Sequence, residues 1–328
     1  MKNSQYIRQA GDDPVHSPKE NRVGEHTSNR KLIEIFEGGE GPGCDPLTEI
    51  RNLVVTITPN HDTGFLEQVH GDITLIFQGK YKNFRHSSTK YHDLRHTRNV
   101  TLATIRLLHG LFMEKTILPP EIMELCVICA YFHDTGMLLT DEDTEQFGSA
   151  YLKSHEVRSI SFLQNYLYDN NMFGHYIDAI PSIINCTNLT VHPEDLDFIS
   201  PELRLTGWVL GTADVMAQMA DRYYLESLPL LYQEQLDAGI ELHSSSLELM
   251  RRTTQFFHEV IEYRLHSSFN NISTAMQTHF REWWGLDRNL YMEQIEKNIK
   301  YLEFVVQKHD SGEGGLYNYL RRKQPQVE

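Results

Sequence analysis

The chain contains little cysteine and no long apolar segment. Its four cysteines are Cys44, Cys126, Cys129 and Cys186, which are too few and too scattered for a disulfide framework and fit a reducing, intracellular setting. No apolar run approaches the ~20 residues that a membrane helix needs. The first residues contain no apolar core of a signal peptide. We therefore predict a soluble, cytoplasmic protein without a membrane partner.

Positive charge is also scarce. The 328 residues include 30 Lys and Arg against 45 Asp and Glu, which gives a formal net charge of −15. Because an acidic surface repels phosphate backbones, bulk nucleic-acid binding is not expected. The apolar share of 40% is sufficient for a sizeable core, and the length alone permits one large domain or two smaller ones.

The polar beginning of the chain differs from the rest. Residues 1–43 end in a glycine-rich stretch, so we expect a flexible leader and linker with a short helix around 30–37. Residues 44–328 are expected to form a single helical domain, with a metal-site core at about 88–226 and a C-terminal helical extension at 227–310.

The stretch from 44 to 90 leaves two interpretations open. Its apolar runs at 53–58 and 73–77 are rich in β-branched residues. Such short runs fit either strands or short buried helices, because brief apolar segments do not distinguish the two.

From about residue 91 onward, apolar residues recur at helical spacing, which predicts an all-α fold. The expected helices cover 100–111, 121–132, 154–167, 201–226, 246–267, 271–284 and 291–306. The segment 121–132 is apolar on nearly all sides, which is typical of a buried central helix.

The first candidate metal-binding or catalytic residues are two histidines in the stretch from Tyr91 to His96. His92 and His96 are four positions apart, and that spacing would place them on one face of a helix. One would then bind a metal ion while the other approached a substrate. The alternative is a polar helix start with two solvated histidines.

A second group follows a buried apolar helix. His133 and Asp134 stand at its expected end, and Gly136 is a natural stop after them. An aspartate is unfavourable at a helix C-terminus because the macrodipole is negative there, and a cation would relieve this. The alternative is a His and an Asp that only cap the helix or contact solvent.

Further candidate ligands come later in the chain. Asp214 lies among apolar neighbours in an expected helix, where a carboxylate needs a cation or hydrogen bonds. His155 and His192 stand at a helix start and in a loop, and each is also readily explained as an ordinary surface histidine. Asp221, followed by Arg222, is either on the same side as Asp214 or part of a surface charge pair.

Two other sequence patterns are not expected to have a functional role. Cys126 and Cys129 have the spacing of a redox or zinc motif, but their apolar helical surroundings favour buried core cysteines. The tetrapeptide His-Asp-Thr-Gly occurs at 133–136 and also at 61–64. The earlier copy follows a turn-like segment and lacks a buried helix before it, so we interpret it as a coincidence.

The ordered set His96, His133, Asp134 and Asp214 resembles the signature of the HD-domain metal-dependent phosphohydrolase superfamily, which includes the cyclic-nucleotide phosphodiesterases. The stretch from Tyr91 to His96 also resembles the Tyr-His-Asn-x-x-His segment of class I phosphodiesterases. The resemblance covers roughly 88–226. It implies an all-α, phosphodiesterase-like helical bundle.

The resemblance also implies roles for particular residues. Asp134 would be catalytic and would bind metal, with His96, His133 and Asp214 as further ligands, and His92 would protonate the leaving oxygen. Histidines at 155 and 192 resemble the additional ligands of two-metal members. Two divalent ions (Mn, Mg, Zn or Fe) are therefore expected as cofactors.

The expected substrate is a small phosphate ester or nucleotide, with a cyclic nucleotide among the candidates. The sequence departs from the class I phosphodiesterases at two positions: Met137 stands where they carry His, and Asp93 stands where they carry Asn. Two rival interpretations stay open, a non-catalytic regulatory or scaffold protein and a di-iron oxygenase of HD type. Three roles stay open for the aromatic-rich C-terminal helices: a wall of the pocket, a homodimer interface, or additional core packing.

Overall fold

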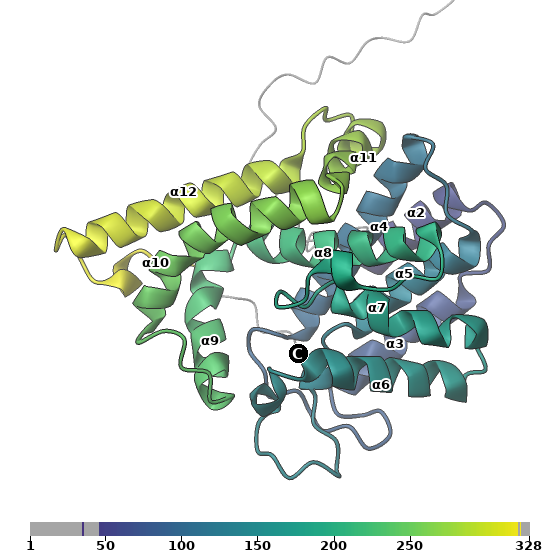
Figure 1. Ribbon diagram of the computed structural model, residues 1–328, viewed down its shortest axis with the longest axis horizontal. Helices are drawn as coiled ribbons and strands as arrows, with labels where there is room; N and C mark the ends of the chain where they lie inside the picture. Colours follow the sequence, from purple (N-terminus) through teal and green to yellow (C-terminus); the bar gives the residue numbers. More distant parts are fainter. Residues whose placement is uncertain (1–34, 36–45, 321, 323–328) are drawn as a thin grey trace, which may run out of the picture.

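The computed structural model describes residues 46–320 together with residues 35 and 322. The described residues contain no strand, only isolated β-bridges that join Gln78 to His86 and Phe84 to Thr140. The α-helices are α2 (Pro46–Ile57), α3 (Gly64–Phe77), α4 (Leu94–Met113), α5 (Pro120–Phe132), α6 (His155–Asp169), α7 (Ile180–Asn185), α8 (Pro201–Ala220), α9 (Tyr224–Asp237), α10 (Ser246–Phe256), α11 (Ala275–Trp284) and α12 (Leu290–Asp310). The predicted all-α fold is confirmed (Figure 1).

The expected leader at 1–43, its helix at 30–37 and Cys44 lie outside the described residues, except for Ile35. The side chain of Ile35 is buried, and its carbonyl oxygen accepts a hydrogen bond from Arg106 Nη2 at 2.6 Å. The same guanidinium donates to Glu49 of α2 and to the hydroxyl of Tyr291 of α12. Arg106 therefore joins α4 to two other helices.

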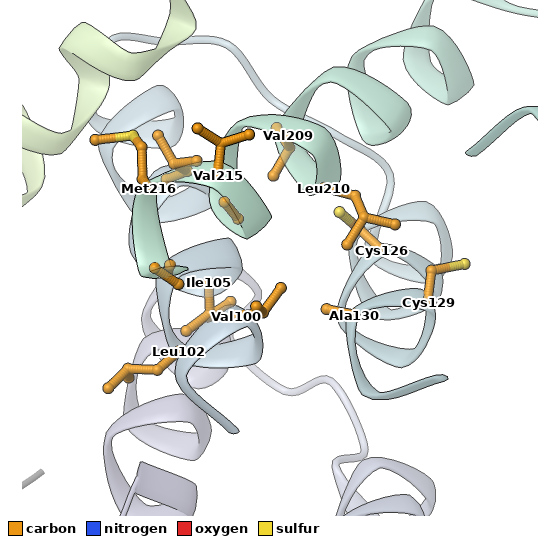
Figure 2. Packing of buried hydrophobic residues seen from close by; sticks show 14 of the residues in the cluster. Val100, Leu102, Ile105, Cys126, Cys129, Ala130, Val209, Leu210, Val215 and Met216 are labelled. Carbon is orange, nitrogen blue, oxygen red and sulfur yellow. The ribbon is translucent and has the colours of Figure 1, made fainter. Parts of the chain in front are cut away.

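The helices α4, α5 and α8 form the centre of the molecule. Figure 2 shows their apolar side chains packed at a common interface, among them Val100, Ala130 and Leu210, which are all fully buried. Every residue of α5 from Ile122 to Phe132 is buried, as the sequence predicted. Since the chemistry-bearing residues lie on or beside these three helices, core packing brings them together.

Both ambiguous runs in 44–90 are helical. In α2, the buried residues are Ile50, Leu53, Val54 and Ile57, which recur at the spacing of one helix face. In α3, buried residues likewise recur three or four positions apart. Burial on one face therefore outweighs the β preference of the branched residues, so the strand interpretation is wrong.

The helix expected from 201 to about 226 is divided. It ends at Ala220, and a new helix begins at Tyr224. Asp221 leaves the helical conformation, with ψ 133°, and its carboxylate accepts a hydrogen bond from the N–H of Tyr223. Its carbonyl oxygen accepts another from Asn298 Nδ2 of α12. One local and one distant hydrogen bond therefore stabilise a break that the sequence pattern does not reveal.

The C-terminal part is helical as predicted, with one local difference. The expected helix at 246–267 is α-helical only to Phe256 and continues as two π-helical turns, Phe257–Ile261 and Arg264–Ser268. In Figure 1, α12 extends alongside α10, and α12 also packs on α8. In the described part of the chain, no helix has the combination of length and apolarity that crossing a bilayer requires.

Candidate metal centre

Three central helices bring four predicted ligands to one place. His96 lies in the first turn of α4, His133 directly follows α5, Asp134 comes next, and Asp214 lies within α8. We call these four residues the His/Asp cluster. Asp93 fixes the start of α4, because its carboxylate accepts a hydrogen bond from the backbone N–H of His96 at 2.8 Å.

The side chains of the cluster face one another at ion-pair distances. His96 Nε2 lies 3.2 Å from Asp134 Oδ2 and 3.3 Å from Asp214 Oδ1. His133 Nε2 lies 3.1 Å and 3.6 Å from the same two oxygens. The ligand atoms of His96, His133 and Asp214 all lie within 4.8 Å of one another, so one cation can contact all of them.

The imidazoles of His96 and His133 each direct a ring nitrogen, Nε2, at the centre of the His/Asp cluster. His133 Nδ1 donates a hydrogen bond to the carbonyl oxygen of Ala130 at 2.8 Å, which leaves Nε2 as the free ligand atom. His96 Nε2 lies only 3.3 Å from His133 Nε2. Asp134 Oδ2 is buried and, although close to both rings, accepts no well-aligned hydrogen bond from the described residues. A bound cation would satisfy all three atoms.

His155 approaches the other oxygen of Asp134. Its Nε2 lies 3.4 Å from Asp134 Oδ1, and its Nδ1 donates to the carbonyl oxygen of Leu152 at 2.8 Å. This position depends on Gly136, where a Cβ atom would lie 1.9 Å from the carbonyl oxygen of His155. Asp134 therefore has one oxygen facing the cluster and one facing His155, as a bridging carboxylate requires.

The cluster has an electrostatic preference for positive charge. Burial disfavours a charged His96, but its close contacts with the carboxylates of Asp134 and Asp214 outweigh this and raise its pKa to about 9. For His155, the interaction with Asp134 likewise overcomes burial and raises the pKa to about 9. Burial alone would raise the pKa of Asp214, yet its contacts with His133 and His96 lower it to about 2. Burial would also raise the pKa of Asp134, but its contacts with His133, His155 and His96 lower it well below its usual range, so both carboxyl groups are ionised near neutral pH.

His92 lies in the turn before α4, not on the helix with His96 as the spacing suggested. Its Nδ1 donates a hydrogen bond to Glu234 Oε2 at 2.6 Å. Its ring centroid lies 6.1 Å from that of His96 and 5.8 Å from that of His155. The imidazole of His92 therefore stands beside the His/Asp cluster without belonging to it.

Glu234 of α9 is a site residue that the sequence did not reveal. Its side chain is buried, and Oε1 accepts hydrogen bonds from the backbone N–H groups of Lys90 and Tyr91, each at 2.8 Å. Together with its bond to His92, this fixes the whole turn before α4. The only signal in the sequence is a glutamate among the polar residues of a helix, which is too common to identify it.

His192 is the one predicted ligand that the structure leaves apart from the others. It is exposed, in the loop between α7 and α8. Within the described part of the chain, it has no hydrogen bond or ion pair with the His/Asp cluster. The backbone beside it is held by Arg264, which donates to the carbonyl oxygen of Val191 at 2.8 Å.

The remaining candidates have structural roles. Asp221 forms an ion pair with Arg95, with 2.6 Å between Oδ2 and Nη1, and the side chains are largely buried, so it is not part of a surface pair with Arg222. Cys126 and Cys129 are free and buried in the core, as predicted, and burial raises the pKa of both thiols.

In comparisons with known proteins, no protein-family model, no curated protein and no solved structure matches the chain. The described residues thus define an all-α protein with a buried His/Asp group that can hold a metal ion.

Proposed function

We propose that this protein is a metal-dependent hydrolase that acts on a phosphate ester. The observation that carries the proposal is the convergence of His96, His133, Asp134 and Asp214 on one point, with the imidazole of His92 beside it. More particularly, the resemblance of these residues to cyclic-nucleotide phosphodiesterases points to a phosphodiester or nucleotide substrate.

The donor set fits a divalent metal ion. Imidazole nitrogens and carboxylate oxygens together suit Mn, Fe, Zn or Mg. The His/Asp cluster would hold the first ion, and Asp134 Oδ1 with His155 would contribute to a second; His192 has no contact that supports its expected role. When bound, the metal would acidify a water molecule and offset the charge of the substrate phosphate.

His92 is the residue that would supply the proton. Its Nδ1–H is directed at the carboxylate of Glu234, so the proton to be transferred is the one on Nε2. Glu234 orients the imidazole through this bond and also holds the backbone of Lys90 and Tyr91. A carboxylate that orients an imidazole in this way is typical of a general acid held in position by a second group.

The test combines elemental analysis with an activity assay. Protein stripped of metal and reloaded with Mn or Mg is assayed on bis-p-nitrophenyl phosphate, cyclic mononucleotides and cyclic dinucleotides. We expect metal-dependent hydrolysis that is lost, together with the metal, in Asp134→Ala. The exposed Asp195→Ala variant serves as the matched control and retains both.

Two results would contradict the proposal. Protein that binds metal but hydrolyses none of these esters would favour the regulatory or scaffold interpretation. Oxygen consumption by iron-loaded protein with a polyol or phosphonate, without ester hydrolysis, would favour the oxygenase.

A further inference from the structure

A cavity lies at the opposite end of α5 from the His/Asp cluster. It has a volume of about 390 Å³ and is lined by the start of α3, the first turns of α5 and the loop after α6. Small-molecule sites commonly enclose ~300–1,000 Å³. Glu124, which lines this cavity, precedes His133 by nine positions. At ~1.5 Å per residue, the two sites are ~14 Å apart along the helix.

Glu124 contributes a largely buried carboxylate to the wall of this cavity. Its side chain is buried, with 4% of the residue exposed, and Oε2 pairs with His61 Nε2 at 3.0 Å. Oε1 is buried and has no hydrogen-bond donor among the described residues. Burial raises the pKa of Glu124, the contact with His61 opposes this rise, and the nearby carboxyl groups of Asp62 and Glu121 add to it. An unmatched buried carboxylate oxygen is costly, and a cationic N–H group is its best partner.

Two aromatic rings complete the wall. Phe65 and Phe173 both line the cavity, with centroids 6.1 Å apart and planes inclined by 35°. Phe173 has φ 55°, a left-handed conformation that is strained for a bulky residue. Asn171 in the same loop has φ 53°. Such strain persists where surrounding structure maintains it and is concentrated at ligand sites.

The spacing of the polar groups favours a molecule over a metal ion. In the described part of the chain, three potential ligand atoms come within 4.8 Å of one another only at the His/Asp cluster. The carboxylates of this cavity instead surround a volume that is far larger than an ion. Carboxylate and aromatic faces in one cavity are the groups that recognise organic cations.

We propose that this cavity binds a small organic cation with N–H donors, a protonated amine or a guanidinium. The cationic group would donate to the Glu124 carboxylate, and its apolar part would lie against Phe65 and Phe173. The His-Asp-Thr-Gly copy at 61–64, which the sequence left without a role, supplies His61 and Asp62 to this wall. This binding is separate from the proposed hydrolysis.

The test is isothermal titration calorimetry of the full chain with four small molecules. Phenethylamine and agmatine offer N–H donors, choline is a cation without them, and 2-phenylethanol is a neutral analogue of phenethylamine. We expect saturable binding of the first two and at least about tenfold weaker binding of the others, because a charge-assisted hydrogen bond is lost. Glu124→Gln should weaken the binding of phenethylamine by a similar factor, whereas Glu142→Gln, at an exposed position, should leave it unchanged.

A second variant tests the proposal independently in case Glu124→Gln does not fold. Phe173→Gly removes the ring but accepts a positive φ, so the loop is retained and phenethylamine binding should fall severalfold. Thermal unfolding and Mn binding at the His/Asp cluster report whether each variant is folded. The proposal is overturned if neither amine binds saturably, if choline binds as well as phenethylamine, or if folded Glu124→Gln and Phe173→Gly bind like the unchanged chain.

Discussion

Two imidazole nitrogens, His96 Nε2 and His133 Nε2, lie 3.3 Å apart and share two buried carboxylates. Two neutral rings in this position direct lone pairs at each other unless a proton or a metal ion lies between them. Protons and metal ions therefore compete for the same lone pairs, and metal binding must release protons.

The pH dependence of stability follows from this competition. In the metal-free chain, the pKa values of His96 and His155 are about 9, above the ordinary 6.5. A raised folded-state pKa contributes stability that is complete below 6.5 and is lost as the pH rises through about 9. We expect the melting temperature of the metal-free chain to fall across this window, whereas the affinity for Mn rises as protons leave.

Thermal unfolding with chelator and Mn titrations at several pH values measure the two trends. His96→Asn should flatten the metal-free slope, and the exposed His258→Asn is the matched control. An unchanged slope in His96→Asn would contradict the assignment of the titrating group.

The division of roles between His92 and the metal ligands is testable in the same way. Because His92 lies beside the cluster and bonds to Glu234, His92→Ala should slow hydrolysis by ~10²–10⁴-fold while the bound metal is retained. Glu234→Gln keeps an acceptor for the backbone but removes the charge, so it should also lower turnover and retain metal. Metal analysis and steady-state rates are the measurements, and loss of metal from His92→Ala would show that His92 is a ligand.

At the scale of elements, the short segment after α5 determines where α6 begins. Gly136 N–H donates to Ser159 Oγ at 2.8 Å, and Arg158 Nε donates to the Gly136 carbonyl oxygen at 2.8 Å. A Cβ atom at position 136 would lie 1.9 Å from the His155 carbonyl oxygen and 2.8 Å from Arg158 Cβ. The backbones approach too closely for any side chain.

We therefore expect Gly136→Ala to destabilise the fold by ~1–3 kcal/mol, the usual cost of overpacking, and to move His155 away from Asp134. Urea unfolding measures the loss of stability. A metal titration measures the displacement of His155, which should weaken the binding of a second metal ion. Gly71→Ala, in an exposed helical position of α3 with no described atom within 4 Å, is the control and should be neutral or stabilising. Equal effects from the two substitutions would contradict this account.

The elements also show what the sequence can and cannot predict. Apolar periodicity predicted the central helices, and the burial of α5 made His133 and Asp134 conspicuous. It did not predict the break at Asp221 or the role of Glu234, because their partners are distant in the chain: Arg95 and Asn298 for the first, the turn around Tyr91 for the second. Such long-range hydrogen bonds leave no local pattern.

At the scale of the whole molecule, one apolar cluster extends from Ile35 and α2 to α12 and Leu316. The two proposed sites lie at opposite ends of α5, inside the same packed unit. A ligand that binds only the folded chain stabilises it by mass action. Metal at the His/Asp cluster should therefore raise the unfolding temperature of the entire molecule.

The central claim is that four side chains from three helices hold a cation, and metal content tests it most directly. After exposure to excess Mn or Zn and exhaustive dialysis, we predict at least one retained metal ion per chain, lost in Asp214→Ala and kept in the exposed Asp195→Ala. A folded chain that retains no metal, or an Asp214→Ala variant that retains as much as the unchanged protein, would contradict the account.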